Sequence, residues 1–163
     1  MENDVTSAAA QVRRLKQVYE QLEAELQQPA MIQRLRQSAD NNEWSTLQIL
    51  GHMVEMIPYW LRHCQTLVAA MGNPPQFGRT LDEPERLEGI ARGATKNPDE
   101  LICLLKQEIA IATETIQSMS PMERDKTGIH IRHGEMTVEN TLETFVVSHA
   151  EDHLAQVKKA LHA

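Results

Sequence analysis

Two histidines near the end of the chain have the spacing and the setting of metal ligands. His149 and His153 are four residues apart, so on a helix their rings lie one above the other on the same face. That face is apolar, because Leu142, Val146 and Val157 continue the same stripe. An imidazole on such a stripe needs partners for a donor and an acceptor, and a shared metal ion would satisfy one nitrogen of each ring. The pair therefore indicates either a metal site or two hydrogen-bonded core histidines.

A metal site with open positions needs a third protein ligand, and the chain has seven histidines in all. We predict that His52 is this ligand, because it lies at the edge of the apolar stripe of a helix with a clear start signal. Glu55 and Tyr59 lie on the same face of that helix. The other four histidines are expected to be solvent-exposed: His63, His130, His133 and His162. Of these, His130 and His133 could rim a pocket.

Residue types exclude two other kinds of metal centre. Ferritin-like di-iron bundles use Glu-x-x-His on two helices, and no glutamate stands three residues before any histidine of this chain. Zincins need His-Glu-x-x-His, whereas Ala150-Glu151-Asp152 separates the two histidines here. A mononuclear site with three imidazoles and open coordination positions remains.

The elements that would hold these residues are helices. Apolar residues recur at helical spacing through most of the chain, no β-alternation of useful length appears, and a Gly- and Pro-containing connection separates the second and third long helices. Ser45 and Gln48 form a capping box, and Pro58 is expected to kink the helix that they begin. These features predict an all-α four-helix bundle with a long crossover connection. The predicted long helices run from Val5 to Leu26, Ser45 to Met71, Asn97 to Met119 and Thr137 to Leu161, with a short piece around Met31–Leu35 and another around Glu85–Ala91 within the connection at 72–97.

Length and charge narrow the class of protein. A chain of 163 residues with 41% hydrophobic residues is long enough for one well-packed domain, which we predict to span residues 1–163. Sixteen Lys and Arg face 23 Asp and Glu, for a net charge of -7. Binding to nucleic acid or to anionic lipid needs clustered positive charge, and the sequence has no such cluster. We therefore expect neither nucleic acid nor a membrane as a partner.

The sequence also favours a cytoplasmic location. The first residues carry acid where a signal peptide carries base, and no stretch approaches the roughly 18 apolar residues of a membrane span. Cys64 and Cys103 lie far apart on predicted apolar stripes, so both are expected to be buried free thiols.

Three segments together resemble the DinB/YfiT-like family of metal-dependent bundle proteins. The helix start at 44–53 (WSTLQILGHM) is similar to the tryptophan-serine motif that leads to the family's first ligand histidine. The segment at 134–138 (GEMTV) resembles the entry to the family's last helix, and 148–157 (SHAEDHLAQV) resembles its closing histidine motif. Helix number and order match over essentially the whole chain, and Pro58 is a departure within the second helix.

This resemblance implies a metal-dependent enzyme. Family members transfer low-molecular-weight thiols to electrophiles, isomerise through a thiol adduct, or hydrolyse amides. It implies a divalent ion on His52, His149 and His153, with zinc or nickel ahead of iron or manganese, and a small-molecule thiol or electrophile as substrate. Glu55 or Asp152 would orient imidazole N–H groups, and Tyr59 is a candidate pocket residue that core packing explains equally well. A homodimer is also implied; the alternative is a non-catalytic dimeric bundle that binds a metal or a small ligand.

Overall fold

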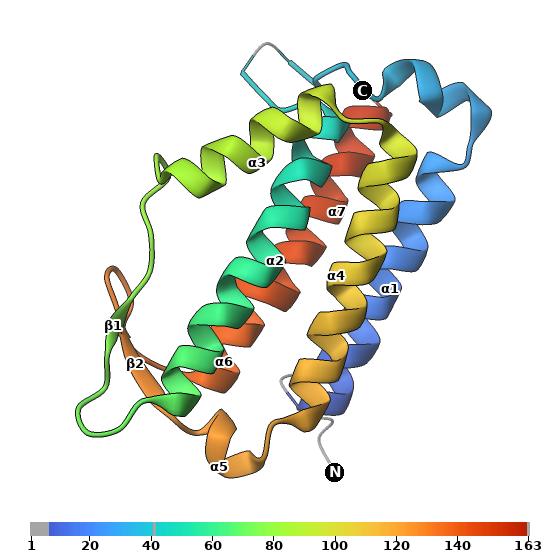
Figure 1. Cartoon of the computed structure of the whole chain (residues 1–163). Coiled ribbons are helices and arrows are strands. Elements are labelled where there is room, and N and C mark those ends of the chain that lie inside the picture. The colour runs from blue at the N-terminus through green and yellow to red at the C-terminus, as the bar shows by residue number, and fades with distance from the viewer. Residues whose placement is uncertain (1–6, 41, 163) are drawn as a thin grey trace.

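Four long helical segments pack side by side in the computed structural model, which describes residues 7–40 and 42–162 (Figure 1). Each of them contacts two others, in the cyclic order α1, α4, α2, α7. The all-α four-helix bundle predicted from the sequence is confirmed; Val5, the predicted start of the first helix, lies outside the described residues. The segments are α1 (Ala8–Leu26), α2 (Thr46–Ala69), α4 (Pro98–Ser118) and a continuous run of α6 (Val138–Leu142), the π-helical η2 (Glu143–Val147) and α7 (Ser148–Leu161).

The helix starts are those that the capping residues predict. The Ser45 side chain accepts a hydrogen bond from the Gln48 backbone, while the Gln48 side chain accepts one from the Ser45 backbone. Asn97 and Thr137 cap α4 and α6 in the same way through their side-chain oxygens. Pro58 lies within α2, which continues past it to Ala69 as one helix. The start of the helix that carries His52 is therefore set by local sequence.

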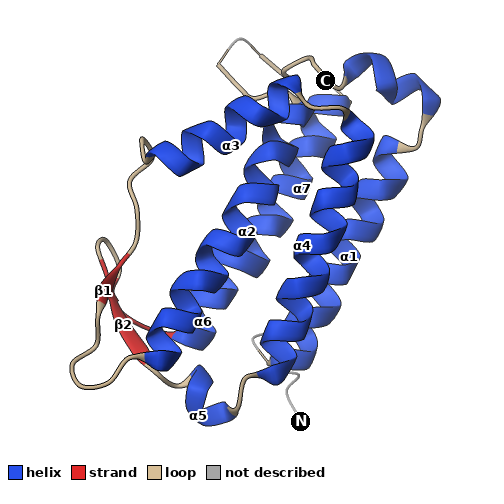
Figure 2. Ribbon diagram, in the orientation of Figure 1, coloured by secondary structure: helices blue, strands red, loops and turns tan. Residues whose placement is uncertain are grey.

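The connection between α2 and α4 crosses the bundle on the outside of α2 (Figure 2). It contains α3 (Pro84–Thr95), which packs on α2 through glycines. A Cβ atom on Gly51 would lie 2.5 Å from the Gly89 carbonyl oxygen and 2.6 Å from the Gly93 Cα atom. The absence of side chains at this crossing lets α3 approach α2 beside His52.

A small sheet at one end of α2 corrects the sequence analysis, which predicted no strands. β1 (Gln76–Phe77) pairs in parallel with β2 (Thr127–His130), and β2 pairs antiparallel with β3 (Gly134–Thr137). Strands of two to four residues are too short to show an alternating pattern, and β1 and β2 lie far apart in the sequence. Two further short helices complete the described chain: the 3-10 helix η1 (Pro29–Arg34) and α5 (Pro121–Arg124).

The core lies between the four long helices and is built from leucine, isoleucine, valine and methionine. Cys64 is buried in it, as predicted, but Cys103 is exposed on α4, because its position falls just off the buried stripe of Leu101 and Leu105. Across residues 7–40 and 42–162, the helices are too short or too polar to span a bilayer.

The α2–α3 crossing predicts an unusual outcome for Gly51→Ala. Alanine normally stabilises a helix interior by about 1 kcal/mol over glycine. Here the added Cβ meets backbone atoms that cannot turn away, and overpacking of this kind costs about 1–3 kcal/mol. We therefore expect a lower free energy of unfolding in urea denaturation, and a rise would contradict the close approach. Gly72→Ala, at φ +87° with no atom near its Cβ, is the control for backbone strain alone.

Candidate metal centre

The three histidines predicted to be ligands meet inside the bundle. His52 comes from α2, and His149 and His153 come from α7. Their ring centroids are 4.5 Å apart for His149 and His153, 4.8 Å for His52 and His153, and 5.6 Å for His52 and His149. One nitrogen from each ring lies within 4.8 Å of the others. The packing of α2 against α7 thus places three imidazoles around one point.

One nitrogen of the cluster is free to bind a metal. His153 is 8% exposed, and its Nδ1 lies 2.9 Å from Oε1 of Gln156, one turn further along α7. An amide oxygen only accepts, so Nδ1 carries the proton and donates it. Nε2 is then left with a lone pair, and it is buried without a hydrogen-bond partner in the described structure. A buried acceptor without a donor is costly unless something binds it, and a cation would.

Burial and mutual repulsion keep the three rings neutral. Burial lowers the pKa of His153 to about 3, with further lowering from His149 and His52. It lowers the pKa of His149 to about 4, again with a contribution from His52, and it lowers the pKa of His52 as well. Metal ions bind the deprotonated imidazole. These rings are therefore in the ligand form at neutral pH.

Glu55 lies against His52 and is itself fixed by an arginine. Its Oε2 is 3.4 Å from Nδ1 of His52, close enough for electrostatic attraction but outside hydrogen-bond geometry. Arg79, 8% exposed, forms a two-pronged ion pair with Glu55 and a second pair with Glu83. The Arg79 guanidinium also lies 3.9 Å from the centre of the Tyr59 ring. Glu55 can orient His52, and Tyr59 lies one step further away, beneath the arginine.

The structure does not bring Asp152 to the imidazoles. Its side chain is exposed on α7, and among the described residues the contact with His153 Nδ1 is made by Gln156. The i, i+3 spacing of His153 and Gln156 was the available signal for this contact. The sequence marked Trp44 as part of the helix start but did not predict its contact with the histidines: its ring stacks on His153 at 6.3 Å and meets His52 edge-on at 5.2 Å. The residue that precedes the α2 cap therefore also covers the histidines.

The other histidines lie outside this cluster. His133 and His162 are exposed, as predicted. His63 is instead half-buried against Tyr59, and His130 is 3% exposed in β2. His130 Nδ1 accepts hydrogen bonds from the backbone of Arg132 and His133, so it supports the turn between β2 and β3. The expectation of a solvated loop was wrong for His130 because the short sheet was not foreseen.

A π-helical segment sets the position of His149. The widened turns of η2 end immediately before Ser148, and such segments are frequent at functional sites. Arg14 of α1 bonds both carboxylate oxygens of Glu143, at 2.7 and 2.9 Å, and also bonds Glu151. These two acids lie on either side of His149 in the chain. These ion pairs tie α1 to the helical run on both sides of His149 and so restrain the position of that ring.

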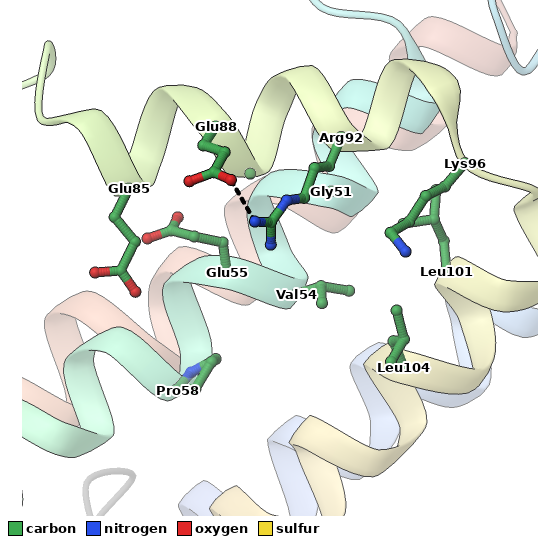
Figure 3. Close-up of a pocket in the computed structure, with 11 residues that line it drawn as sticks. Gly51, Val54, Glu55, Pro58, Glu85, Glu88, Arg92, Lys96, Leu101 and Leu104 are labelled. Atoms are coloured by element: carbon green, nitrogen blue, oxygen red, sulfur yellow. Dashed lines mark hydrogen bonds and ion pairs between the residues drawn. The ribbon is translucent and has the colours of Figure 1, made fainter.

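Three hollows adjoin Glu55 or the histidines, and they differ in chemistry. A larger one, of about 310 Å³, lies between α2, α3 and α4 (Figure 3). Its charged side chains mostly pair with one another or with neighbours, as in Arg92–Glu88 and Arg62–Glu85. A smaller cavity of about 70 Å³ is lined by His52 and His149 themselves. A further hollow, of about 280 Å³, is lined by Trp44, His153 and Gln156. The small cavity thus reaches the candidate metal centre at His52 and His149, and this further hollow reaches it at His153.

Fold and site together define a four-helix bundle with a buried cluster of three neutral histidines. The model of the DinB superfamily matches residues 14–157, so the chain belongs to the DinB superfamily. Among solved structures, the chain is similar to YfiT from Bacillus subtilis, described as a probable metal-dependent hydrolase with an unusual four-helix bundle topology. That match has a TM-score of 0.77 and 15% identity, and covers 94% of this chain and 85% of that one. No curated protein matches the chain.

The cluster predicts which histidines metal binding requires. His149→Ala and His52→Ala should each abolish stoichiometric binding of a divalent ion, because two imidazoles hold an ion poorly against solvent. His63→Ala, on the same helix as His52, should leave metal content unchanged. Elemental analysis after chelation and refilling measures this. Full metal occupancy in His149→Ala or His52→Ala would exclude this site. Loss of metal only in His63→Ala would mean that the site lies elsewhere along α2.

Proposed function

We propose that this protein is a metal-dependent enzyme, of the hydrolase or the thiol S-transferase type, with His52, His149 and His153 as ligands. The observation that carries the proposal is the unpaired buried Nε2 of His153, in a cluster where one nitrogen from each of three neutral imidazoles lies within 4.8 Å of the others. Three histidine ligands leave positions open for substrate, as catalytic rather than structural sites do. Zinc or nickel suits this donor set best, ahead of iron or manganese. The description of YfiT as a hydrolase supports the hydrolytic type.

The bound ion would supply Lewis acidity and lower the pKa of a water or thiol ligand toward neutrality. The chain's residues provide the rest. Gln156 holds His153 in the tautomer that presents Nε2, and Glu55 attracts Nδ1 of His52. Contacts with Arg79 and His52 lower the pKa of Glu55 despite its burial, so it is a weak base and is better suited to positioning. Tyr59 acts only through Arg79 in this scheme.

One observation keeps S-transfer as a second candidate. With Glu55 held by Arg79, the cavity beside His52 and His149 has no carboxylate among its described lining residues to act as a general base. A thiol needs less help than water, because its ordinary pKa of about 8.5 is already near neutrality. Whether the nucleophile is water or a thiol therefore distinguishes the hydrolase from the S-transferase.

Activity assays with refilled protein test the proposal. We expect either hydrolysis of activated esters and amides without added thiol, or conjugation of a small thiol to an electrophilic arene. The activity should disappear on chelation and in His149→Ala, and should persist in His63→Ala. Activity that is indifferent to both chelation and His149→Ala would contradict the proposal. Metal binding without either reaction would favour a non-catalytic metal- or ligand-binding bundle, for which a homodimer stays a prediction.

A further inference from the structure

Positive charge surrounds the small cavity beside the histidines, in a chain whose net charge is -7. Arg79, Arg86 and Arg132 line it together with His52 and His149. No acidic side chain belongs to its described lining. The three arginines come from the connection between α2 and α4 and from the turn between β2 and β3. Segments far apart in the sequence therefore bring like charges to one opening.

Two of these arginines have no acidic partner. Arg79 is neutralised by Glu55 and Glu83. Arg86 is half-buried and donates to the Leu81 carbonyl oxygen at 2.6 Å, but no carboxylate pairs with it in the described part of the chain. Arg132 is exposed at the cavity and likewise has no described ion pair. The charge of Glu55 reaches Arg86, but Glu55 is already paired with Arg79, whose own charge repels Arg86. An anion bound directly to this half-buried cation would therefore stabilise the site.

Arg86 belongs to the same electrostatic unit as the metal centre. Its guanidinium lies 5.2 Å from the centre of the Trp44 ring, and Trp44 contacts both His52 and His153. Its charge contributes to the lowered pKa of each of the three histidines. A divalent ion on three neutral ligands would add two more positive charges here. The lining of this cavity is thus positive without an ion, through Arg86 and Arg132, and would be more so with one.

The cavity also has an aromatic wall. Trp60 and Phe145 both line it and stack on each other at 4.3 Å between ring centroids. At about 70 Å³ the cavity admits only a compact group, so the larger part of any organic molecule would lie outside, toward Arg132. The opening therefore combines a flat apolar surface with guanidinium groups.

We propose that the substrate carries an oxyanion, a carboxylate or a phosphate, that Arg86 and Arg132 bind while its reacting group lies at the histidines. That the bound molecule is a substrate rests on the proposed function, whereas the anion site itself does not need the metal. Guanidinium groups match both oxyanions, because their planar fork donates two parallel hydrogen bonds. The apolar part of the substrate would pack against Trp60 and Phe145.

Ligand titrations followed by tryptophan fluorescence test the anion site. Both tryptophans of the chain, Trp44 and Trp60, lie beside it. The probes are benzoate, phenyl phosphate and the neutral isostere benzamide, added to metal-free and to zinc-refilled protein. We expect at least one anion to bind at least about tenfold more tightly than benzamide in both forms, as for a charge-assisted hydrogen bond. The ratio of benzoate to phenyl phosphate distinguishes the two oxyanions.

Variants assign the binding to particular arginines. Arg86→Gln and Arg132→Gln should each weaken binding of the preferred anion, Arg86→Gln by about tenfold or more, and leave benzamide unchanged. Arg86→Lys should retain more of the affinity than Arg86→Gln. Arg92→Gln, on the same helix but paired with Glu88 away from the cavity, is the matched control and should change affinity less than about twofold. Circular dichroism confirms that each variant is folded; should Arg86→Gln unfold, Arg86→Lys and Arg132→Gln decide.

Equal binding of benzamide and the anions, or equal effects of Arg86→Gln and Arg92→Gln, would overturn the anion site. Anion binding only in zinc-refilled protein, undiminished in Arg86→Gln and Arg132→Gln, would also overturn it, because the metal alone would then hold the anion. The metal-free titration keeps these outcomes separate from the proposed function. Failure of the metal site appears instead in elemental analysis and leaves the arginine effects intact.

Discussion

Three neutral imidazoles packed against one another, one of them with an unpaired buried nitrogen, are the constraint on which the rest of the site depends. Nε2 of His153 is buried and has no hydrogen-bond partner in the described structure, while Nδ1 of His52 has only the approach of Glu55 at 3.4 Å. An unpaired buried polar group costs about 1–3 kcal/mol of stability, and a leucine at the same position would avoid that cost. The cost is explained if a ligand shared by the three rings repays it. Trp44, Gln156 and Glu55 then have a common role, which is to hold the rings in place.

The supporting contacts come from segments that do not carry the histidines. Arg14 of α1 spans the π-helical segment through Glu143 and Glu151, and the glycine crossing brings α3 close to α2. That crossing also fixes where Arg86 can lie, because α3 carries it. The four long helices thus build the core, and the connection between α2 and α4 adds Arg79 and Arg86 beside the cavity.

The parts that could be predicted from sequence are those determined locally. The Ser45–Gln48 capping box, the Asn97 cap and the i, i+4 spacing of His149 and His153 are short-range patterns, and the structure has each of them. His52 was found because its helix was well marked. The sheet escaped notice because β1 and β2 pair across a long separation in the chain. The sequence did not place Arg79 and Arg86 at the site for the same reason: nothing near them in the chain indicates that a loop and α3 fold back onto His52.

Thermal unfolding of the metal-free protein tests most directly whether the centre is an addition to an adequate core. We expect a cooperative apo transition, with a midpoint that rises on adding metal. At a hundredfold excess over Kd the stabilisation is about 2.7 kcal/mol, or roughly 5–10 °C for a chain of this length. His149→Ala should unfold cooperatively but show no rise with metal. An apo protein that is already unfolded would mean that the metal is structural and would contradict the account.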